Sequence, residues 1–434
     1  MRWRNIELFV VCTFLMLTLA EFIQAAIQIR IFGPNLLHYR IWQYIVIVVI
    51  FLSDRHAFKT RSMTAVYVYT VIYLVMGLLG HYVSQRYEIV GTGVINILPV
   101  DLAVTLLIKE HYLRPEKIRD LRIVLKVAWF AFILACITSL IVITRYPSAV
   151  RGTEYEYFRG DVSTFKRLGL GGYGLFSSLP FLIPIVFYYY KDTLRQNRFK
   201  SFFYLLVIAL FIYTSYKAVI VAPFIITLTV VLLSALGRKR FKTNLIIILL
   251  LLAFFVVTPR HIIGQVFIGV SETIPNRDMS TKLRDIGISY ITGIDISEAA
   301  EGSVSTVEHR AARIAINWDQ FLANPLIGKG TSGNPHLYWL NILAQFGLLG
   351  AFPIIWVTLI QFVYWEKLEE EYRFYYFVSI LAYVVMLFIK AHGGYHYYLA
   401  VFFMVPGSYY LRHGFNLEHG VQEPSMEMVS SEAA

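Results

Sequence analysis

The sequence is poor in charge and in cysteine, and each deficit argues against a class of protein. Charged residues make up 15% of the chain, whereas about a quarter of a soluble globular protein is charged. Its two cysteines, Cys12 and Cys136, lie inside apolar runs, so we expect packed thiols and neither a disulfide framework nor a zinc site. The HExxH, CxxC, Walker and Asp-x-Asp patterns are also absent, and no metal or cofactor is expected.

One glycine-rich stretch matches a nucleotide-binding pattern by letters alone. Gly169-Leu-Gly-Gly-Tyr-Gly174 fits GxGxxG, but it follows no predicted strand and opens an apolar run. We therefore interpret these glycines as sites of close helix packing by small residues.

Apolar residues are abundant. They form 57% of the chain and recur in runs of about 18 residues or more, each long enough to cross a bilayer. Phenylalanine (32) and tyrosine (30) are numerous near the ends of these runs, as in interfacial aromatic belts. The first run, 6–24, is too long for a signal peptide and is expected to be an uncleaved helix. The composition predicts an all-α polytopic membrane protein.

The apolar runs predict twelve transmembrane spans. They are expected near 6–28, 38–53, 63–82, 92–109, 123–144, 168–190, 201–215, 218–236, 244–258, 336–364, 374–391 and 396–411. The chain would then comprise nine spans in 1–258, a loop subdomain in 259–335, three spans in 336–411 and a polar, disordered tail in 412–434.

Lysine and arginine lie mainly in alternate connectors and give a formal net charge of +11. These connectors, around Arg4, Lys59, Arg114, Lys200 and Arg238, fall on one side if every span exists. By the positive-inside rule that side is the cytoplasm, where both termini would also lie. No basic stretch belongs to a nucleic-acid-binding module, so nucleic acid is not an expected partner.

The segment 259–335 is expected to be a large helical loop on the periplasmic side. Ser305-Thr-Val-Glu308 has capping-box spacing, and an apolar stripe at helical spacing then runs to Trp318 and Leu322. Asn324-Pro325 and the following glycines end this helix. The residues on its flanking polar face are Arg310, Arg313 and Asn317.

Topology gathers several ionisable residues at the outer surface although they are distant in sequence. They are Arg167, Lys217, Arg310, Arg313 and His336. Guanidinium groups bind phosphate oxygens in bidentate fashion, so a cationic cluster at a lipid interface suits a lipid diphosphate. Histidine is the side-chain type whose ordinary pKa suits general-base chemistry at neutral pH.

Each residue also has an ordinary structural explanation. Arg167 could extend to phospholipid head groups, and Lys217 could be a charge packed beside apolar sequence. Arg310 and Arg313 could be solvated helix residues, and His336 could make an interfacial hydrogen bond. Weaker candidates on the same side are Lys390, His392 and His396.

The residues around His336 resemble a known signature. Phe321-Leu-Ala-Asn-Pro-Leu-Ile-Gly-Lys-Gly330, then His336 and Gly347-Leu-Leu-Gly350, are similar to the pattern of the O-antigen ligase and polymerase superfamily. Twelve spans, cytoplasmic termini and a large periplasmic loop between spans nine and ten are similar to the architecture of these bacterial inner-membrane enzymes.

The resemblance implies a lipid-dependent, GT-C-like glycosyltransferase fold and a metal-independent reaction. A glycan would move from undecaprenyl diphosphate to an acceptor hydroxyl on the periplasmic face. His336 would deprotonate or orient the acceptor. Arg167, Lys217 and Arg310, with Arg313 on the same helix as Arg310, would stabilise negative charge on the diphosphate leaving group.

Departures from the family pattern favour a polymerase over a ligase. Tyr216-Lys217 stands where Ser-Arg is frequent, and Leu337 stands where Asn often follows the histidine. The strongly aromatic composition is also typical of divergent polymerases. A polymerase would transfer a growing chain to one lipid-linked repeat unit, whereas a ligase would transfer the finished chain to lipid A-core.

The resemblance also implies the partners. They are the undecaprenyl-diphosphate-linked glycan, the lipid-linked repeat unit or lipid A-core acceptor, membrane lipids and a chain-length regulator. A transporter or flippase is the remote alternative, because the sequence has no internal repeat and Glu21 and Asp101 are the main acids within expected spans.

Overall fold

The structure is a computed structural model, and nearly all of the residues it describes are helical. These are 2–27, 38–84, 100–146, 149–152, 162–194, 196–218, 221–237, 260–273, seven positions between 280 and 291, 316–328, 338–363, 368, 370–389 and 394–413. No strand occurs among them. The helices long and apolar enough to cross a bilayer are Pro115–Arg145, Tyr173–Leu194, Arg198–Lys217, Tyr338–Gln361 and Glu371–Phe388. The predicted class, a helical membrane protein, agrees with these findings.

Most of the expected spans coincide with a described helix. In chain order the helices are α1 (Arg2–Leu19), α2 (Glu21–Ala26), α3 (Tyr39–Ser53), η1 (Arg55–Lys59), α4 (Arg61–Ser84), α6 (Val100–Tyr112), η3 (Pro115–Lys117), α7 (Ile118–Arg145), α8 (Ala149–Gly152), α9 (Val162–Leu168), α10 (Tyr173–Leu194), α11 (Arg198–Lys217), α12 (Val221–Leu236), α14 (Arg260–Thr273), α18 (Tyr338–Val363), α19 (Glu370–Ile389), α20 (Tyr395–Tyr398), η7 (Leu399–Met404) and α21 (Val405–His413). The ninth expected span, 244–258, and most of the expected tail lie outside the described residues.

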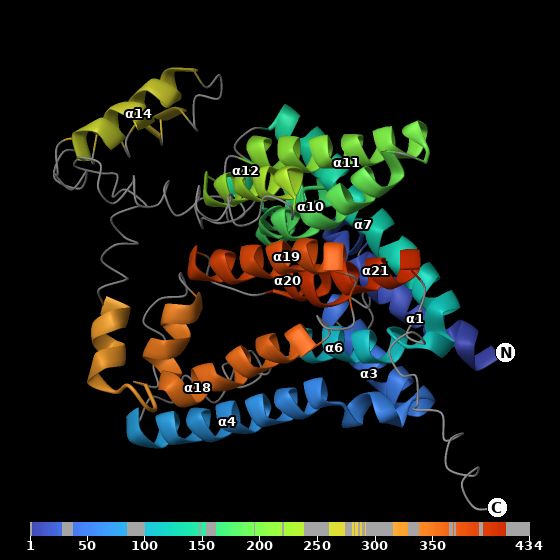
Figure 1. Cartoon of the computed structure of the whole chain (residues 1–434). Helices are drawn as coiled ribbons and strands as arrows, with labels where there is room; N and C mark the ends of the chain where they lie inside the picture. The colour runs from blue at the N-terminus through green and yellow to red at the C-terminus, as the bar shows by residue number, and fades with distance from the viewer. Residues whose placement is uncertain are drawn as a thin grey trace, which may run out of the picture.

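The long helices pack into one bundle. α1 packs against α3 and α7, α4 packs against α18, and α10 packs against α11, α12 and α19. In Figure 1, α10, α11 and α12 lie on one side of α19, and α4 and α18 lie on the other. α14 lies at the edge of this view, far from the N-terminus.

Contacts at both ends of α1 show that α1 and α7 run in the same direction. Near their first residues, Arg4 Nε donates to Asp120 Oδ1 over 2.8 Å. Near their last residues, Glu21 and Ser139 lie beside the loop that leads into α10. Arg4 and Glu21 are about 25 Å apart at the rise of an α-helix. We call these two levels of the bundle the N-terminal end and the Glu21 end.

Three expected spans are interrupted, which their apolar runs did not predict. α1 and α2 are separated at Ala20 (φ −109°, ψ 65°), and α18 contains Gly347 with the non-helical angles φ 62° and ψ −163°. The last expected span contains η7, a π-helical segment between α20 and α21. Glycine tolerates a positive φ, and π-helical segments alter the direction of a helix. A continuous apolar run therefore does not require a continuous helix.

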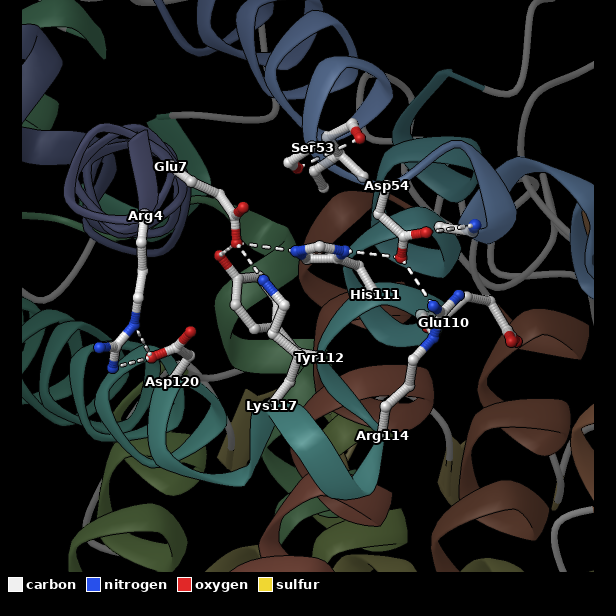
Figure 2. A network of polar contacts seen from close by, with 12 residues as sticks. Arg4, Glu7, Ser53, Asp54, Glu110, His111, Tyr112, Arg114, Lys117 and Asp120 are labelled. Carbon is white, nitrogen blue, oxygen red and sulfur yellow. Dashed lines mark hydrogen bonds and ion pairs between the residues drawn. The ribbon is translucent and has the colours of Figure 1, made fainter. Parts of the chain in front are cut away.

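A polar network centred on His111 joins four helices at the N-terminal end (Figure 2). His111 Nε2 lies 2.7 Å from Glu7 Oε1, and His111 Nδ1 lies 2.9 Å from Asp54 Oδ2. An ionised carboxylate can only accept hydrogen bonds. A ring nitrogen that carries a proton can therefore donate to the carboxylate beside it, and His111 links Glu7 of α1 to Asp54 at the end of α3.

Further donors surround the same two carboxylates. Tyr112 OH and Lys117 Nζ donate to Glu7 Oε1 over 3.1 and 3.2 Å. An Arg114 guanidinium nitrogen lies 2.9 Å from Asp54 Oδ2. Burial alone would raise the pKa of the Asp54 carboxyl, but the hydrogen bond from His111 and the charge of Arg114 outweigh it and lower the pKa.

Some residues of the basic connectors are internal partners and not solvated charges. Lys109, expected at the start of a connector, is fully buried, and its ammonium donates to Gln361 Oε1 of α18. Lys191 Nζ donates to the carbonyls of Ser234 and Ala235, both over 2.9 Å, at the end of α12. Both lysines thus donate to acceptors within the protein, and Lys191 does so at the carbonyl end of a helix.

Replacing Asp54 with asparagine should destabilise the protein at neutral pH. Asp54→Asn removes a charge that binds both His111 and Arg114, so thermal unfolding in detergent should show a loss of roughly 1–3 kcal/mol. Because the pKa of Asp54 is lowered on folding, its contribution is present above its ordinary pKa of about 4 and is lost as pH falls further. The variant should therefore lose less stability than wild type between about pH 5 and pH 3.

Glu116→Gln is the matched control for Asp54→Asn. Glu116 is an exposed acid at the same end of the bundle, in the connector between α6 and α7, so its replacement should change the free energy of unfolding by less than about 0.5 kcal/mol. Equal stability of Asp54→Asn and Glu116→Gln at pH 7 would contradict the role given to Asp54.

Candidate functional site

Glu21 is the centre of a polar cluster at the Glu21 end. Its carboxylate is largely buried and accepts from Tyr395 OH over 2.5 Å and from Lys166 Nζ over 3.1 Å. His396 Nδ1 lies 3.8 Å from Glu21 Oε1, too far for a hydrogen bond but close enough for an electrostatic contact. The cluster thus joins α2, α9 and α20, which are distant in sequence.

The glycine-rich stretch before α10 closes around this cluster. A Cβ at Gly172 would lie 2.8 Å from Glu21 Oε1, and a Cβ at Gly174 would lie 2.9 Å from His396 Nδ1. Gly169, at φ 114°, would place a Cβ 2.8 Å from Thr138 of α7. Only hydrogen fits at these positions without movement of a neighbour. The interpretation of the GxGxxG letters as close packing is therefore confirmed.

Arg167 follows Lys166 on α9, but the two cations have different surroundings. Lys166 is bound to Glu21, whereas the Arg167 side chain is exposed. Successive helical residues point in directions about 100° apart, so one residue can anchor α9 while the next faces outward. The Lys166–Glu21 pair thus fixes the helix that presents Arg167.

Lys217 ends α11 and is half-buried. Its ammonium lies 5.5 Å from the centre of the Tyr213 ring, a cation–π distance. Among the described residues, no carboxylate forms an ion pair with it. Because α10 leads away from the Glu21 end and α11 returns, Lys217 and Arg167 lie at the same end of the bundle.

Two described residues of the segment 259–335, Phe267 and Leu283, pack against the bundle beside Lys217. Tyr216 and Phe224 have ring centroids 5.7 Å apart, and both pack against the buried Leu283, as does Phe267 of α14. This small apolar cluster attaches α14 and the positions near 283 to the junction of α11 and α12. The Tyr216-Lys217 pair is therefore an attachment point as well as a source of charge.

The two glycine-containing parts of the signature meet in the structure. Leu348 N–H donates to the Pro325 carbonyl over 2.9 Å, and Leu349 N–H donates to the Leu326 carbonyl over 3.1 Å. The turn 324–328 is therefore hydrogen-bonded to the backbone of α18 just after its kink. The interruption at Gly347 frees these N–H groups from the preceding helical turn, and the turn satisfies them.

Gly328 and Gly347 permit this contact. Both have positive φ, 68° and 62°. A Cβ at Gly328 would lie 2.4 Å from the Gln345 carbonyl carbon, and one at Gly347 would lie 2.4 Å from the Leu326 carbonyl carbon. The two backbones thus approach at glycine on both sides. They fix the ends of the connection that contains His336.

Three of the predicted site residues, Arg310, Arg313 and His336, lie outside the described residues. The same is true of Lys390 and His392 and of the expected capping box at 305–308. α18 reaches the N-terminal end near its last residues, where Gln361 binds Lys109. Its first residue, Tyr338, which follows His336 by two positions, therefore lies at the Glu21 end.

The described part of the loop helix, 316–323, has an unexpected orientation. Trp318 and Leu322, from the expected apolar stripe, are 47% and 57% exposed. Asn317, from the expected polar face, is fully buried, and neither its amide nitrogen nor its amide oxygen is hydrogen-bonded. Exposed apolar residues next to a membrane bundle suit contact with lipid, so the stripe is not a core face.

Sequence reasoning missed the centre of the cluster. Lys166 and Tyr395 were not predicted site residues, Glu21 was noted only as an acid within a span, and His396 was a weaker candidate. The available signal was Glu21 itself, because a carboxylate in an apolar run needs a partner inside the protein. Nothing local in the sequence indicates that this partner is Lys166, 145 positions away.

No family model matches the chain, and no curated protein matches it significantly. The site is therefore defined by its own geometry. That geometry combines, at one end of a membrane bundle, the exposed Arg167 on an anchored helix and the half-buried Lys217. It also includes the close backbone contact between Gly328 and Gly347 and their neighbours.

Lys166 and Arg167 are adjacent in α9, and single variants of each test whether Lys166 anchors the helix and Arg167 does not. Lys166→Ala should lower the free energy of unfolding by roughly 1–3 kcal/mol, because Glu21 remains buried without its lysine. Arg167→Ala should change it by less than about 0.5 kcal/mol. Thermal unfolding of both variants in one detergent makes the comparison, and equal losses would contradict the assignment.

The glycine contact predicts that Gly347→Ala is destabilising. The variant combines an unfavourable φ with a clash against Leu326, and we expect a loss of about 1–3 kcal/mol or more in thermal unfolding. Gly269→Ala in α14 is the control, since a Cβ there meets nothing within 4 Å; its effect should be within about 1 kcal/mol. Wild-type stability in Gly347→Ala would rule out the close approach.

Proposed function

We propose that this chain is a glycosyltransferase that moves a glycan from undecaprenyl diphosphate to an acceptor hydroxyl at the Glu21 end of the bundle. The observation that carries the proposal is the backbone contact between the turn 324–328 and Gly347. Both parts belong to the stretch that resembles the O-antigen ligase and polymerase superfamily. Their contact accounts for two signature glycines and fixes both ends of the connection that holds His336.

The proposed reaction is a displacement at the anomeric carbon of the donor. The acceptor oxygen forms a bond to this carbon as the bond to the diphosphate oxygen breaks. His336 takes the hydroxyl proton or orients the hydroxyl, and undecaprenyl diphosphate leaves with the bonding electrons. No metal is invoked in this step.

Cations at the Glu21 end would stabilise the leaving group. Arg167 is suited to this role, because its guanidinium is exposed beside an anchored lysine. Lys217 is half-buried and has no carboxylate partner among the described residues, so its charge is available to an anion. Arg310 and Arg313 complete the proposed binding set. Lys217 supplies a point charge and not the bidentate fork that an arginine would provide.

The membrane arrangement belongs to the same proposal. It comprises twelve spans, a GT-C-like fold, cytoplasmic termini and a Glu21 end that faces the periplasm of a bacterial inner membrane. The described helices alternate between the two ends, and Arg4, Arg55 and Arg114 lie at the N-terminal end. By the positive-inside rule this supports a cytoplasmic N-terminal end. The large segment 259–335 would then form a cover on the periplasmic side.

Within this class we favour polymerisation of surface-polysaccharide repeats over ligation to lipid A-core. Tyr216 supports this preference, because it attaches the covering segment through Phe267 and Leu283. The residue is thus used for packing where the family often has serine. A chain-length regulator would be a partner of a polymerase.

Transport of a lipid-linked glycan is a second candidate, favoured by the interrupted helices. Broken spans at Ala20 and Gly347 are features of many transporters. In this chain, however, the acid at the first break is bound by Lys166 and Tyr395, and the second break is filled by the turn 324–328. Both interruptions are thus occupied by the protein itself.

Complementation of a deletion strain tests the function. The gene is deleted in its host and restored as wild type, His336→Ala or Arg310→Ala, and surface glycans are compared on a gel at equal expression. A null strain with single repeats on its surface anchor indicates a polymerase. Long chains on undecaprenyl diphosphate with a bare core indicate a ligase, and accumulation of donor on the cytoplasmic face indicates transport.

The arginine variant has an expected magnitude. Arg310→Ala should lower turnover of a lipid-linked donor about 100-fold, equivalent to roughly 3 kcal/mol of barrier, because one contact to the leaving group is lost. Lys200→Ala, an exposed lysine at the N-terminal end, should leave turnover unchanged. Comparable rates in Arg310→Ala and wild type would refute the role of Arg310, and full complementation by His336→Ala would refute that of His336.

A further inference from the structure

Two grooves lie on either side of α7 and share one cation, Lys126. The larger has a volume of about 920 Å³ and lies between α7, α10, α11 and α21. The smaller, about 660 Å³, lies between α7 and the first two helices. Lys126 lines both, with Trp129 and Ile133 in the larger groove and Val127 and Phe130 in the smaller one.

Both grooves begin near the N-terminal end and extend into the bundle. The larger groove has Gln196 and Asp192 at the turn between α10 and α11 and Val186 farther along α10. Ten residues of helix span about 15 Å, which is about half the thickness of the hydrocarbon core. The larger groove thus has about the depth of one leaflet. The smaller groove is longer, because its lining extends along α1 from Phe9 to Ile23 and Ile27 at α2.

The walls of the larger groove are preformed, because their polar atoms bind one another. Trp129 Nε1 donates to Ser408 Oγ over 3.0 Å, and Tyr189 OH donates to the Ser408 carbonyl. The Tyr189 and Tyr204 rings stack with centroids 5.4 Å apart. The groove therefore presents ring faces and aliphatic groups, which suit an acyl chain.

Lys126 is the available charge where the grooves meet. Its side chain is exposed and forms no ion pair with a carboxylate among the described residues. The smaller groove is otherwise lined by apolar side chains and by Cys12 and Thr13. α7 is a membrane-spanning helix by length and composition, so both grooves open toward lipid. Asp192 also lines the larger groove, but the other side chains that line the two grooves are mainly apolar. A cation where two such grooves meet complements an anionic head group with two chains.

We propose that Lys126 binds the phosphate of an anionic diacyl phospholipid from the leaflet at the N-terminal end, with one acyl chain in each groove. Along α7, Lys126 lies six residues, or about 9 Å, from Asp120 and thirteen residues, or about 20 Å, from Ser139. The head group would therefore lie nearer the N-terminal end than the cations of the proposed glycan transfer do. The lipid would hold α1 and α11 against opposite faces of α7.

Lipid binding by the full-length chain in detergent tests the site. Phosphatidylglycerol and phosphatidylcholine with the same acyl chains are titrated, and bound lipid is counted by native mass spectrometry. Wild type should bind phosphatidylglycerol about five- to tenfold more tightly, and Lys126→Gln should lose that preference. Lys200→Gln is the matched control and should retain it, because Lys200 is exposed at the same end but lines neither groove.

The two-chain arrangement is tested separately. Lysophosphatidylglycerol, with the same head group and one chain, should bind more weakly than the diacyl lipid, and Ile133→Trp should reduce that difference by filling the larger groove. Equal binding of the two head groups, an unchanged preference in Lys126→Gln, or tighter binding of a single-chain polyprenyl phosphate would overturn the proposal. Dimerisation that blocks all lipid binding would also overturn it, by identifying a second copy as the occupant.

Discussion

Polar groups inside a hydrocarbon layer must find their partners within the protein, and this constraint governs the bundle. Glu7, Glu21 and Lys109 are all buried. Each is matched by a group from a helix distant in sequence: His111, Lys166 and Gln361, respectively. An unpaired charge in such surroundings is costly, so these pairs restrict which helices can be neighbours. Apolar packing alone restricts neighbours less, because one apolar helix face resembles another.

The two polar clusters divide the molecule into ends with different properties. At the N-terminal end, basic connector residues bind internal carboxylates and hold α1, α3, α6 and α7 together. At the Glu21 end, one carboxylate holds α9 in place, and the neighbouring arginine remains exposed. Both ends keep exposed cations, such as Lys200 at the first and Arg167 at the second. The proposal places the anionic donor at the Glu21 end because the exposed Arg167 lies there on an anchored helix, together with Lys217.

The interruptions of helices are a second consequence of the same constraint. A break releases backbone N–H groups that need acceptors in a membrane protein. At Gly347 the carbonyls of Pro325 and Leu326 supply them, and glycine on both sides allows the necessary approach. The break in α18 and the turn before it therefore form one unit, although nineteen positions separate Gly328 from Gly347. The unit holds both ends of the connection containing His336.

The sequence by itself determined the helical membrane class and the positions of most described helices, because run length and low charge are local properties of the chain. It also indicated that the glycines at 169–174 serve close packing. Only the tertiary structure decided that α1 stops at Ala20, that Asn317 faces inward while Trp318 is exposed, and that Glu21 binds Lys166 and Tyr395. The proposed site shows the same division: Arg167 and Lys217 could be selected by residue type, whereas their anchoring could not. Pairing across 145 positions depends on which helix faces meet, and such contacts leave no period or spacing in the sequence.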